Sequence, residues 1–311
     1  MVPSAANPSS SIDFGLLGPI TVVVDGHPVP IGGPRQMAVL ARLMLTPDHV
    51  VTMDQLVDSV WDGDEPRRPQ VAVRSYISNL RRVIEPHRRR RASDSCLASS
   101  PAGYRLAVDP ASIDWIRFER LINDGRQHLA AGDWATAVLM LRHAHSLWAG
   151  KPFSGLPESP FFVAQQARLT DLRDTAMELL FEALVVGGDH TSVAAEVDSA
   201  IADSPLRERL TELGMLALYR SGRQSEALAL GKRLRGRLLD ELGVDPSPSI
   251  DAIELKILNH DPSLEATATP SVELDAGRDV ATVPNPTGSA VAGTVGERQT
   301  PDHLVASLPA G

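Results

Sequence analysis

The positions of apolar residues near the start of the chain predict short extended segments. Residues 12–31 contain brief apolar runs that are interrupted by Gly18-Pro19 and by Asp25-Gly26. An Asp-Gly pair between apolar runs favours a type I′ turn, which joins two antiparallel strands. We therefore expect a small antiparallel sheet over residues 12–31.

Two helices are predicted next. The first opens at Pro34 and ends near Thr46-Pro47, because apolar side chains recur there at the spacing of one helical face. Thr52 and Gln55 have the spacing of a capping box, in which each side chain accepts a hydrogen bond from the backbone N–H of the other residue. This pair predicts that a second helix covers Met53–Trp61.

A third helix is predicted over residues 69–85, with Pro69 at its first position. Apolar residues recur along it at helical spacing and predict a stripe that is buried against the rest of the fold. This stripe consists of Val73, Ile77, Leu80 and Ile84.

The opposite face of the third helix carries groups that can read the edges of bases. Its residues are Val71, Arg74, Ser75, Ser78, Asn79 and Arg82. Arginine can bond guanine through two donors, asparagine can pair with adenine, serine suits several bases, and valine can contact the methyl group of thymine. We assign base reading to Val71, Arg74, Ser75, Ser78 and Asn79. A helix that is merely solvated would also carry arginines, so that alternative stays open.

Positive charge is concentrated around this helix, although the chain as a whole has a net charge of -9. Residues 1–110 contain 12 arginines, no lysine and 11 acidic residues. Nine of these arginines, with Glu85 as the single acid, fall within residues 67–91. Such a patch attracts phosphate, whereas the run at residues 87–91 alone would also suit a solvated loop.

The order of elements predicts a winged helix-turn-helix of the OmpR type over residues 12–110. Residues 95–109 hold two short apolar stretches joined by a turn sequence, which predicts a hairpin. In this fold the third helix enters the major groove, and the hairpin, or wing, reaches a phosphate or the minor groove. We assign phosphate and wing contacts to Arg67, Arg68, Arg81, Arg82, Arg88, Arg89, Arg90, Arg91, Tyr104 and Arg105. Arg82 suits either role.

Residues 111–262 are predicted to be all helical. Apolar residues recur there at helical spacing, and the stretch is punctuated by Gly-Asp or Gly-Arg pairs at Gly132, Gly188 and Gly222. The last two glycines are 34 residues apart, which is the tetratricopeptide period. We expect stacked helical hairpins whose groove binds protein, with a plain helical bundle as the alternative geometry.

Several stretches of the sequence carry a family resemblance. The DNA-binding domain of the Streptomyces antibiotic regulatory protein (SARP) family is similar to three of them: FGLLGPITVVVDGHPVPIGGPRQMAVLARLML, YISNLRRVIEP and PAGYRLAVD. Residues 114–262 resemble that family's bacterial transcriptional activation domain, for example at LRHAHSLWAGKPF and LLDELGVDPSPSI. The resemblance implies a homodimer that binds head to tail on promoter direct repeats, recruits RNA polymerase holoenzyme and controls an antibiotic or other secondary-metabolite gene cluster. Val71 and Asn79 depart from residues that are common in the family.

The sequence does not support other classes of function. It contains no P-loop, HExxH or GxSxG motif, so we expect no enzyme activity, catalytic residue, cofactor or metal site. The single cysteine, Cys96, cannot form an intramolecular disulfide, and no apolar run approaches the ~18 residues of a membrane span. We expect a cytoplasmic, nucleoid-associated protein that does not contact a membrane.

The complete prediction is a mostly α chain with a small β content. A disordered N-terminus covers residues 1–11, the winged helix 12–110, the tetratricopeptide-like helical region 111–262 and a disordered tail 263–311. We interpret the chain as a sequence-specific transcriptional activator that binds double-stranded DNA. The alternative is a protein-interaction scaffold that uses its helical region and whose winged helix does not bind DNA.

Overall fold

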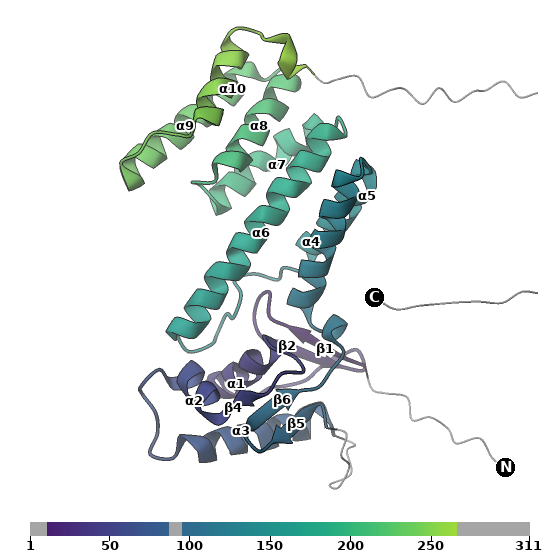
Figure 1. The fold of residues 1–311 in the computed structure, drawn as a ribbon, viewed down its shortest axis with the longest axis vertical. Helices are drawn as coiled ribbons and strands as arrows, with labels where there is room; N and C mark the ends of the chain where they lie inside the picture. Colours follow the sequence, from purple (N-terminus) through teal and green to yellow (C-terminus); the bar gives the residue numbers. More distant parts are fainter. Residues whose placement is uncertain (1–10, 87–94, 266–311) are drawn as a thin grey trace, which may run out of the picture. The chain divides into compact units, whose positions relative to one another are not determined.

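A computed structural model describes residues 11–86 and 95–265 (Figure 1). Its strands are β1 (Ile12–Gly15), β2 (Thr21–Val24), β3 (His27–Pro28), β4 (Val51–Thr52), β5 (Leu97–Ser100) and β6 (Gly103–Leu106). Its helices are α1 (Pro34–Met44), α2 (Met53–Trp61), α3 (Pro69–Ile84), α4 (Asp114–Ala130), α5 (Trp134–Ser146), α6 (Pro160–Val186), α7 (His190–Asp203), α8 (Glu208–Arg220), α9 (Gln224–Leu242) and α10 (Pro248–Leu258), with short 3-10 turns at Pro110–Ser112 and Pro262–Leu264. The described residues are mostly helical, as the sequence predicts.

The first sheet has the order β1-β2-β3 and is antiparallel throughout. Phe14 pairs with Val22, and both side chains are buried. The turn between β2 and β3 is made by Asp25 and Gly26, whose φ angles of 50° and 79° are both positive, as a type I′ turn requires. The predicted hairpin is confirmed.

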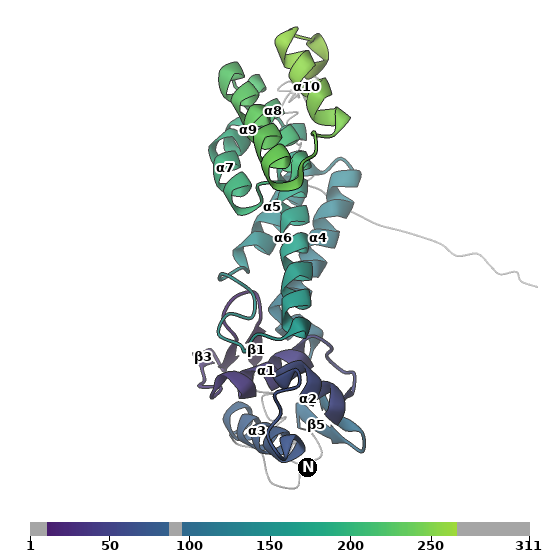
Figure 2. The same cartoon turned by 90° about the vertical axis from the view of Figure 1, so that its left-hand side faces the viewer.

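Helices α1, α2 and α3 form the helical part of the winged helix. Both hydrogen bonds of the capping box between Thr52 and Gln55 are present, and α2 begins immediately after Thr52. The predicted stripe on α3 is buried, since each of its four apolar side chains is at most 1% exposed, and α3 packs on α1 and α2. In both views α3 lies on the opposite side of α1 from the first sheet (Figures 1 and 2).

The second sheet builds the wing and has the order β4-β6-β5. The hairpin of β5 and β6 is the predicted one, but the sequence gives no signal for β4, which has only two residues. Thr52 pairs with Gly103, and a Cβ atom at Gly103 would lie 2.0 Å from the carbonyl oxygen of Val51. Glycine is therefore required for this close pairing, which joins the wing to the start of α2.

Three helical hairpins follow, formed by α4 with α5, α6 with α7, and α8 with α9. Each turn contains one of the predicted glycines, Gly132, Gly188 and Gly222, and all three have positive φ. Asp133 and Asp189 come directly after the first two glycines, and their carboxylates accept backbone N–H bonds at the start of α5 and α7. The Gly-Asp pairs thus end one helix and begin the next.

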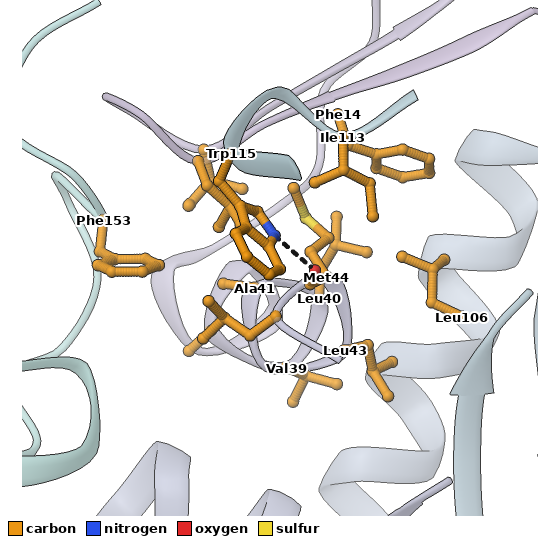
Figure 3. Packing of buried hydrophobic residues seen from close by; sticks show 14 of the residues in the cluster. Phe14, Val39, Leu40, Ala41, Leu43, Met44, Leu106, Ile113, Trp115 and Phe153 are labelled. Carbon is orange, nitrogen blue, oxygen red and sulfur yellow. Dashed lines mark hydrogen bonds between the residues drawn. The ribbon is translucent and has the colours of Figure 1, made fainter. Parts of the chain in front are cut away.

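The hydrophobic core is continuous from the winged helix into α4 and α6. Phe14 and Met44 belong to the same buried cluster as Trp115, Phe118 and Phe162. Figure 3 shows the Trp115 ring over the end of α1, where its indole N–H donates to the carbonyl oxygen of Met44 at 2.9 Å. Side chains from both predicted regions therefore fill one core.

The disordered tail is predicted from Ser263, but the structure describes residues up to Glu265. Leu264 is 5% exposed, and its carbonyl oxygen accepts a 2.7 Å hydrogen bond from Nε of Arg220. The prediction missed this contact because a single leucine in a polar sequence has no periodicity. The predictions for residues 1–10 and 266–311 lie outside the described residues.

Candidate nucleic-acid interface

The outer face of α3 is accessible to a ligand. Arg74, Ser75, Ser78 and Arg82 are exposed, and the side chain of Val71 is 55% exposed. The buried stripe on the other side of the helix fixes the rotation of α3 about its axis. Guanidinium and hydroxyl groups therefore project from one rigid helical surface, which is the arrangement that base reading in a major groove needs.

Asn79 differs from its neighbours because it is partly buried. Its side-chain Nδ2 donates to Oε1 of Gln36 on α1 at 3.3 Å, and its Oδ1 accepts a bond of 2.9 Å from Nη2 of Arg82. The amide thus has a partner at both ends. Gln36 stands in a helix predicted from its apolar residues and belongs to no local motif, so the sequence offers no signal for this contact.

Arg81 joins α3 to the wing. Its Nε donates to the carbonyl oxygen of Leu97 at 2.9 Å, and its Nη2 donates to Oγ of Ser99 at 2.9 Å. The guanidinium carbon lies 5.8 Å from the centre of the Tyr104 ring, within cation-π range. The sequence predicts a phosphate contact for Arg81, whereas its contacts in the structure orient β5 and β6 against the helix.

The other predicted phosphate and wing residues fall into three groups. Arg67 and Arg68 are exposed just before α3. Arg105 on β6 is half-buried and forms an ion pair with Asp48 at 3.9 Å. Arg88, Arg89, Arg90 and Arg91 lie outside the described residues.

The two ends of the segment that carries those four arginines are held together. Glu85, which follows α3, accepts a hydrogen bond of 2.9 Å from Oγ of Ser95 and another from the backbone N–H of Cys96. Burial and the adjacent Glu85 carboxylate both raise the pKa of the Cys96 thiol. The thiol is therefore protonated at neutral pH and is a poor nucleophile.

The described residues contain no group of three or more His, Cys, Asp or Glu side chains that could hold a metal ion. None of the helices within the same residues has the length and apolarity needed to cross a bilayer.

Two protein families match consecutive parts of the chain. Residues 29–106 match the family described as "Transcriptional regulatory protein, C terminal", and residues 113–258 match the "Bacterial transcriptional activator domain". The first match contains α1 to α3 and the wing, and the second contains the three helical hairpins and α10.

Similar proteins carry names that denote regulation. The chain is 37% identical over 272 residues to the regulatory protein AfsR of Streptomyces coelicolor, an alignment that covers 87% of this chain but only 26% of AfsR. It is 35% identical over 259 residues to the transcriptional regulatory protein MoaR1 of Mycobacterium tuberculosis, covering 83% of this chain and 82% of MoaR1.

A solved structure shares the fold. The structure of Mycobacterium tuberculosis EmbR in complex with a low affinity phosphopeptide superposes with a TM-score of 0.76 at 33% identity, covering 82% of this chain and 66% of EmbR. Both the arrangement of the domains in sequence and the similarity to full-length regulators such as MoaR1 point to one assignment. The chain belongs to the Streptomyces antibiotic regulatory protein family of transcriptional regulators.

Proposed function

We propose that this regulator is a sequence-specific activator that reads promoter DNA with the outer face of α3. The observation that carries the proposal is the exposure of Arg74, Ser75 and Ser78 on a helix whose opposite side is completely buried. A helix held in this way loses little conformational freedom when it enters a groove, so its exposed groups are available for base contacts.

Arginines around this face supply affinity that does not depend on sequence. Arg67 and Arg68 lie at the N-terminus of α3, where backbone N–H groups and the helix dipole also favour a phosphate. Each phosphate contact releases counterions, which makes binding weaker at higher salt. In this proposal Arg74, Ser75 and Ser78 select the bases, Val71 contacts a thymine methyl group, and the flanking arginines hold the protein on the backbone.

The family supports a further, finer proposal for how activation occurs. Two subunits bind head to tail on direct repeats near a promoter, and the protein recruits RNA polymerase holoenzyme. The target is a gene cluster for an antibiotic or another secondary metabolite. Footprinting of the full chain on the intergenic regions next to its own gene tests the repeats, and transcription from the protected promoter with purified polymerase tests the recruitment.

Replacement of Arg74 tests the role of α3. Arg74→Ala is expected to cost about 1–3 kcal/mol, or roughly 5- to 150-fold in affinity, on the footprinted site and to flatten the preference at one base pair. Arg120→Ala on α4 also removes an exposed positive charge, but outside α3, and is expected to leave the preference unchanged. An equal loss on random DNA would assign Arg74 to the backbone. Failure of the wild-type chain to bind any of the fragments at low salt would favour the scaffold interpretation instead.

A further inference from the structure

We propose that Gln36 on α1 is a positioning residue for DNA selectivity, because it fixes the direction in which Arg82 projects from α3. The connection runs through Asn79, and we call the three side chains Gln36, Asn79 and Arg82, with the carbonyl group of Ile31, the amide relay. The inference rests on the proposed reading of DNA by α3 and adds to it a residue that does not lie on the reading surface.

The amide relay begins inside the fold and ends at the surface. Gln36 is 7% exposed, and its Nε2 donates to the carbonyl oxygen of Ile31, which precedes α1. Its Oε1 accepts the 3.3 Å bond from Nδ2 of Asn79, and Oδ1 of Asn79 accepts the 2.9 Å bond from Arg82. Asn79 is half-buried and Arg82 is exposed, so each step lies nearer to solvent.

Hydrogen-bond chemistry permits one direction for the relay. A backbone carbonyl group can only accept, so Gln36 must turn its NH2 group toward Ile31 and its oxygen toward Asn79. Asn79 must then offer its own NH2 group to that oxygen, which leaves its Oδ1 facing Arg82, and a guanidinium can only donate. Reversing either amide would place two donors or two acceptors against each other. The direction of the Asn79 amide, whose oxygen orients Arg82, is thus set by the Ile31 carbonyl group two hydrogen bonds away.

The local backbone makes room for the buried amide. Gly32 has a φ of 99°, and a Cβ atom there would lie 2.7 Å from Nε2 of Gln36. A buried glutamine is costly unless both ends of its amide are bonded, and here both are. Neighbouring α1 side chains such as Val39 and Leu40 are fully buried and apolar, so packing alone would favour an apolar residue at position 36.

The relay changes the roles on α3. The amide of Asn79 is occupied at both ends, which assigns it to orienting Arg82 rather than to pairing with adenine. Arg82 uses one of its five N–H donors on Asn79 and keeps the others for guanine or phosphate. Holding the guanidinium in one direction before DNA arrives reduces the freedom lost on binding and favours one base register.

A double-mutant cycle with Gln36→Met and Arg82→Ala in the full chain tests the relay. Methionine keeps the length of the side chain without the amide, and we expect affinity for the footprinted site to fall about three- to tenfold, with a flatter preference at the base pair that Arg82 faces. In the Arg82→Ala background the same change is expected to have no further effect on affinity or preference. Equal effects of Gln36→Met in both backgrounds, or an unchanged preference, would overturn the proposal.

Two further variants separate positioning from stability. Gln127→Met makes the same chemical change at an exposed position of α4 and is expected to alter neither binding nor preference. Asn79→Ala breaks the amide relay on its α3 side and is expected to reproduce the loss of base preference seen with Gln36→Met. This second variant keeps the test decisive if Gln36→Met does not fold. A fall in melting temperature without a change in base preference in Asn79→Ala would also overturn the proposal.

A measurement without DNA distinguishes failure of the relay from failure of DNA binding. In the wild-type chain, NMR is expected to show slower water exchange for the side-chain NH2 protons of Asn79 than for those of the exposed Gln127, and Gln36→Met is expected to remove the difference. Equally fast exchange at both residues in the wild type would refute the relay, whatever the protein does with DNA. If the wild-type chain shows slow exchange at Asn79 but does not bind DNA, the proposed function and the role of Gln36 in selectivity are both refuted. The hydrogen bonds between the two amides would still be supported.

Discussion

Replacement of Asp114, the first residue of α4, tests how the winged helix is held to the helical region. Its carboxylate accepts backbone N–H bonds from Leu16, at 2.9 Å to Oδ1 and 2.8 Å to Oδ2, and from Leu17, at 2.9 Å to Oδ2. Leu16 and Leu17 are at most 1% exposed and follow β1, nearly 100 residues earlier in the chain. Asp114→Ala would leave two buried N–H donors without an acceptor.

The expected cost follows from those two donors. A buried N–H group that loses its acceptor costs about 1–3 kcal/mol, and two would cost roughly 2–6 kcal/mol. Burial also raises the pKa of the Asp114 carboxyl, while the backbone N–H bonds act to lower it. Removal of a carboxylate that is itself expensive to bury recovers part of the cost. We therefore expect Asp114→Ala to lower the free energy of unfolding by about 2–4 kcal/mol.

Urea unfolding followed by circular dichroism measures this loss, with the slope of the transition checked for a change in cooperativity. Asp240→Ala on α9 removes an exposed carboxylate and is expected to stay within about 0.5 kcal/mol of the wild type. Hydrogen exchange gives a local readout, because the amides of Leu16 and Leu17 should lose protection in Asp114→Ala. A variant as stable as the wild type, with both amides still protected, would refute the reasoning.

Three further predictions concern other parts of the chain. Gly103→Ala is expected to lower the melting temperature because its Cβ would collide with the Val51 carbonyl oxygen. As a control, Gly236→Ala adds a Cβ in open space inside α9 and is expected to raise the free energy of unfolding by about 0.5–1 kcal/mol. Equal effects of the two substitutions would contradict the role of close pairing at Gly103. Burial and the nearby Arg173 and Arg142 lower the pKa of His145 below its ordinary value of 6.5. As the pH falls below 6.5, His145 therefore takes up a proton more readily in the unfolded chain than in the folded one, and the free energy of unfolding decreases. His145→Gln should weaken this pH dependence of urea unfolding, and an unchanged dependence would exclude His145 as its source. Replacing Arg88 to Arg91 with alanine should weaken the binding of specific and random DNA alike. It should also reduce the slope of log affinity against log salt concentration by about 0.9 for each lost phosphate contact. An unchanged slope would show that these arginines do not contact DNA.

Local patterns predicted the elements whose signals lie within a few residues. The capping box of Thr52 and Gln55 located the start of α2, and the Asp25-Gly26 pair located the first hairpin. The apolar repeat on α3 identified both the buried stripe and the exposed face opposite it. In each case the physical cause, a cap, a turn or a periodic face, is encoded by neighbouring residues.

Contacts between distant residues escaped prediction because no local pattern specifies them. Gln36 and Asn79 are 43 residues apart, and the single acceptor for Leu16 and Leu17 lies about 100 residues further along the chain. The exposed chemistry of Arg74, Ser75 and Ser78 was readable from the helical wheel. The engagement of Arg81 by the wing was not, because it depends on where β5 folds back.

The continuous core has a consequence for any attempt to move the winged helix into another protein. A cut near residue 110, between the two family matches, would separate Phe14 and Met44 from Trp115, Phe118 and Phe162, which belong to the same buried cluster. The truncated piece would present a raw apolar surface to water and tend to aggregate. A portable fragment or chimera should therefore retain α4 to α6, and the shortest useful unit of this regulator is longer than its winged helix.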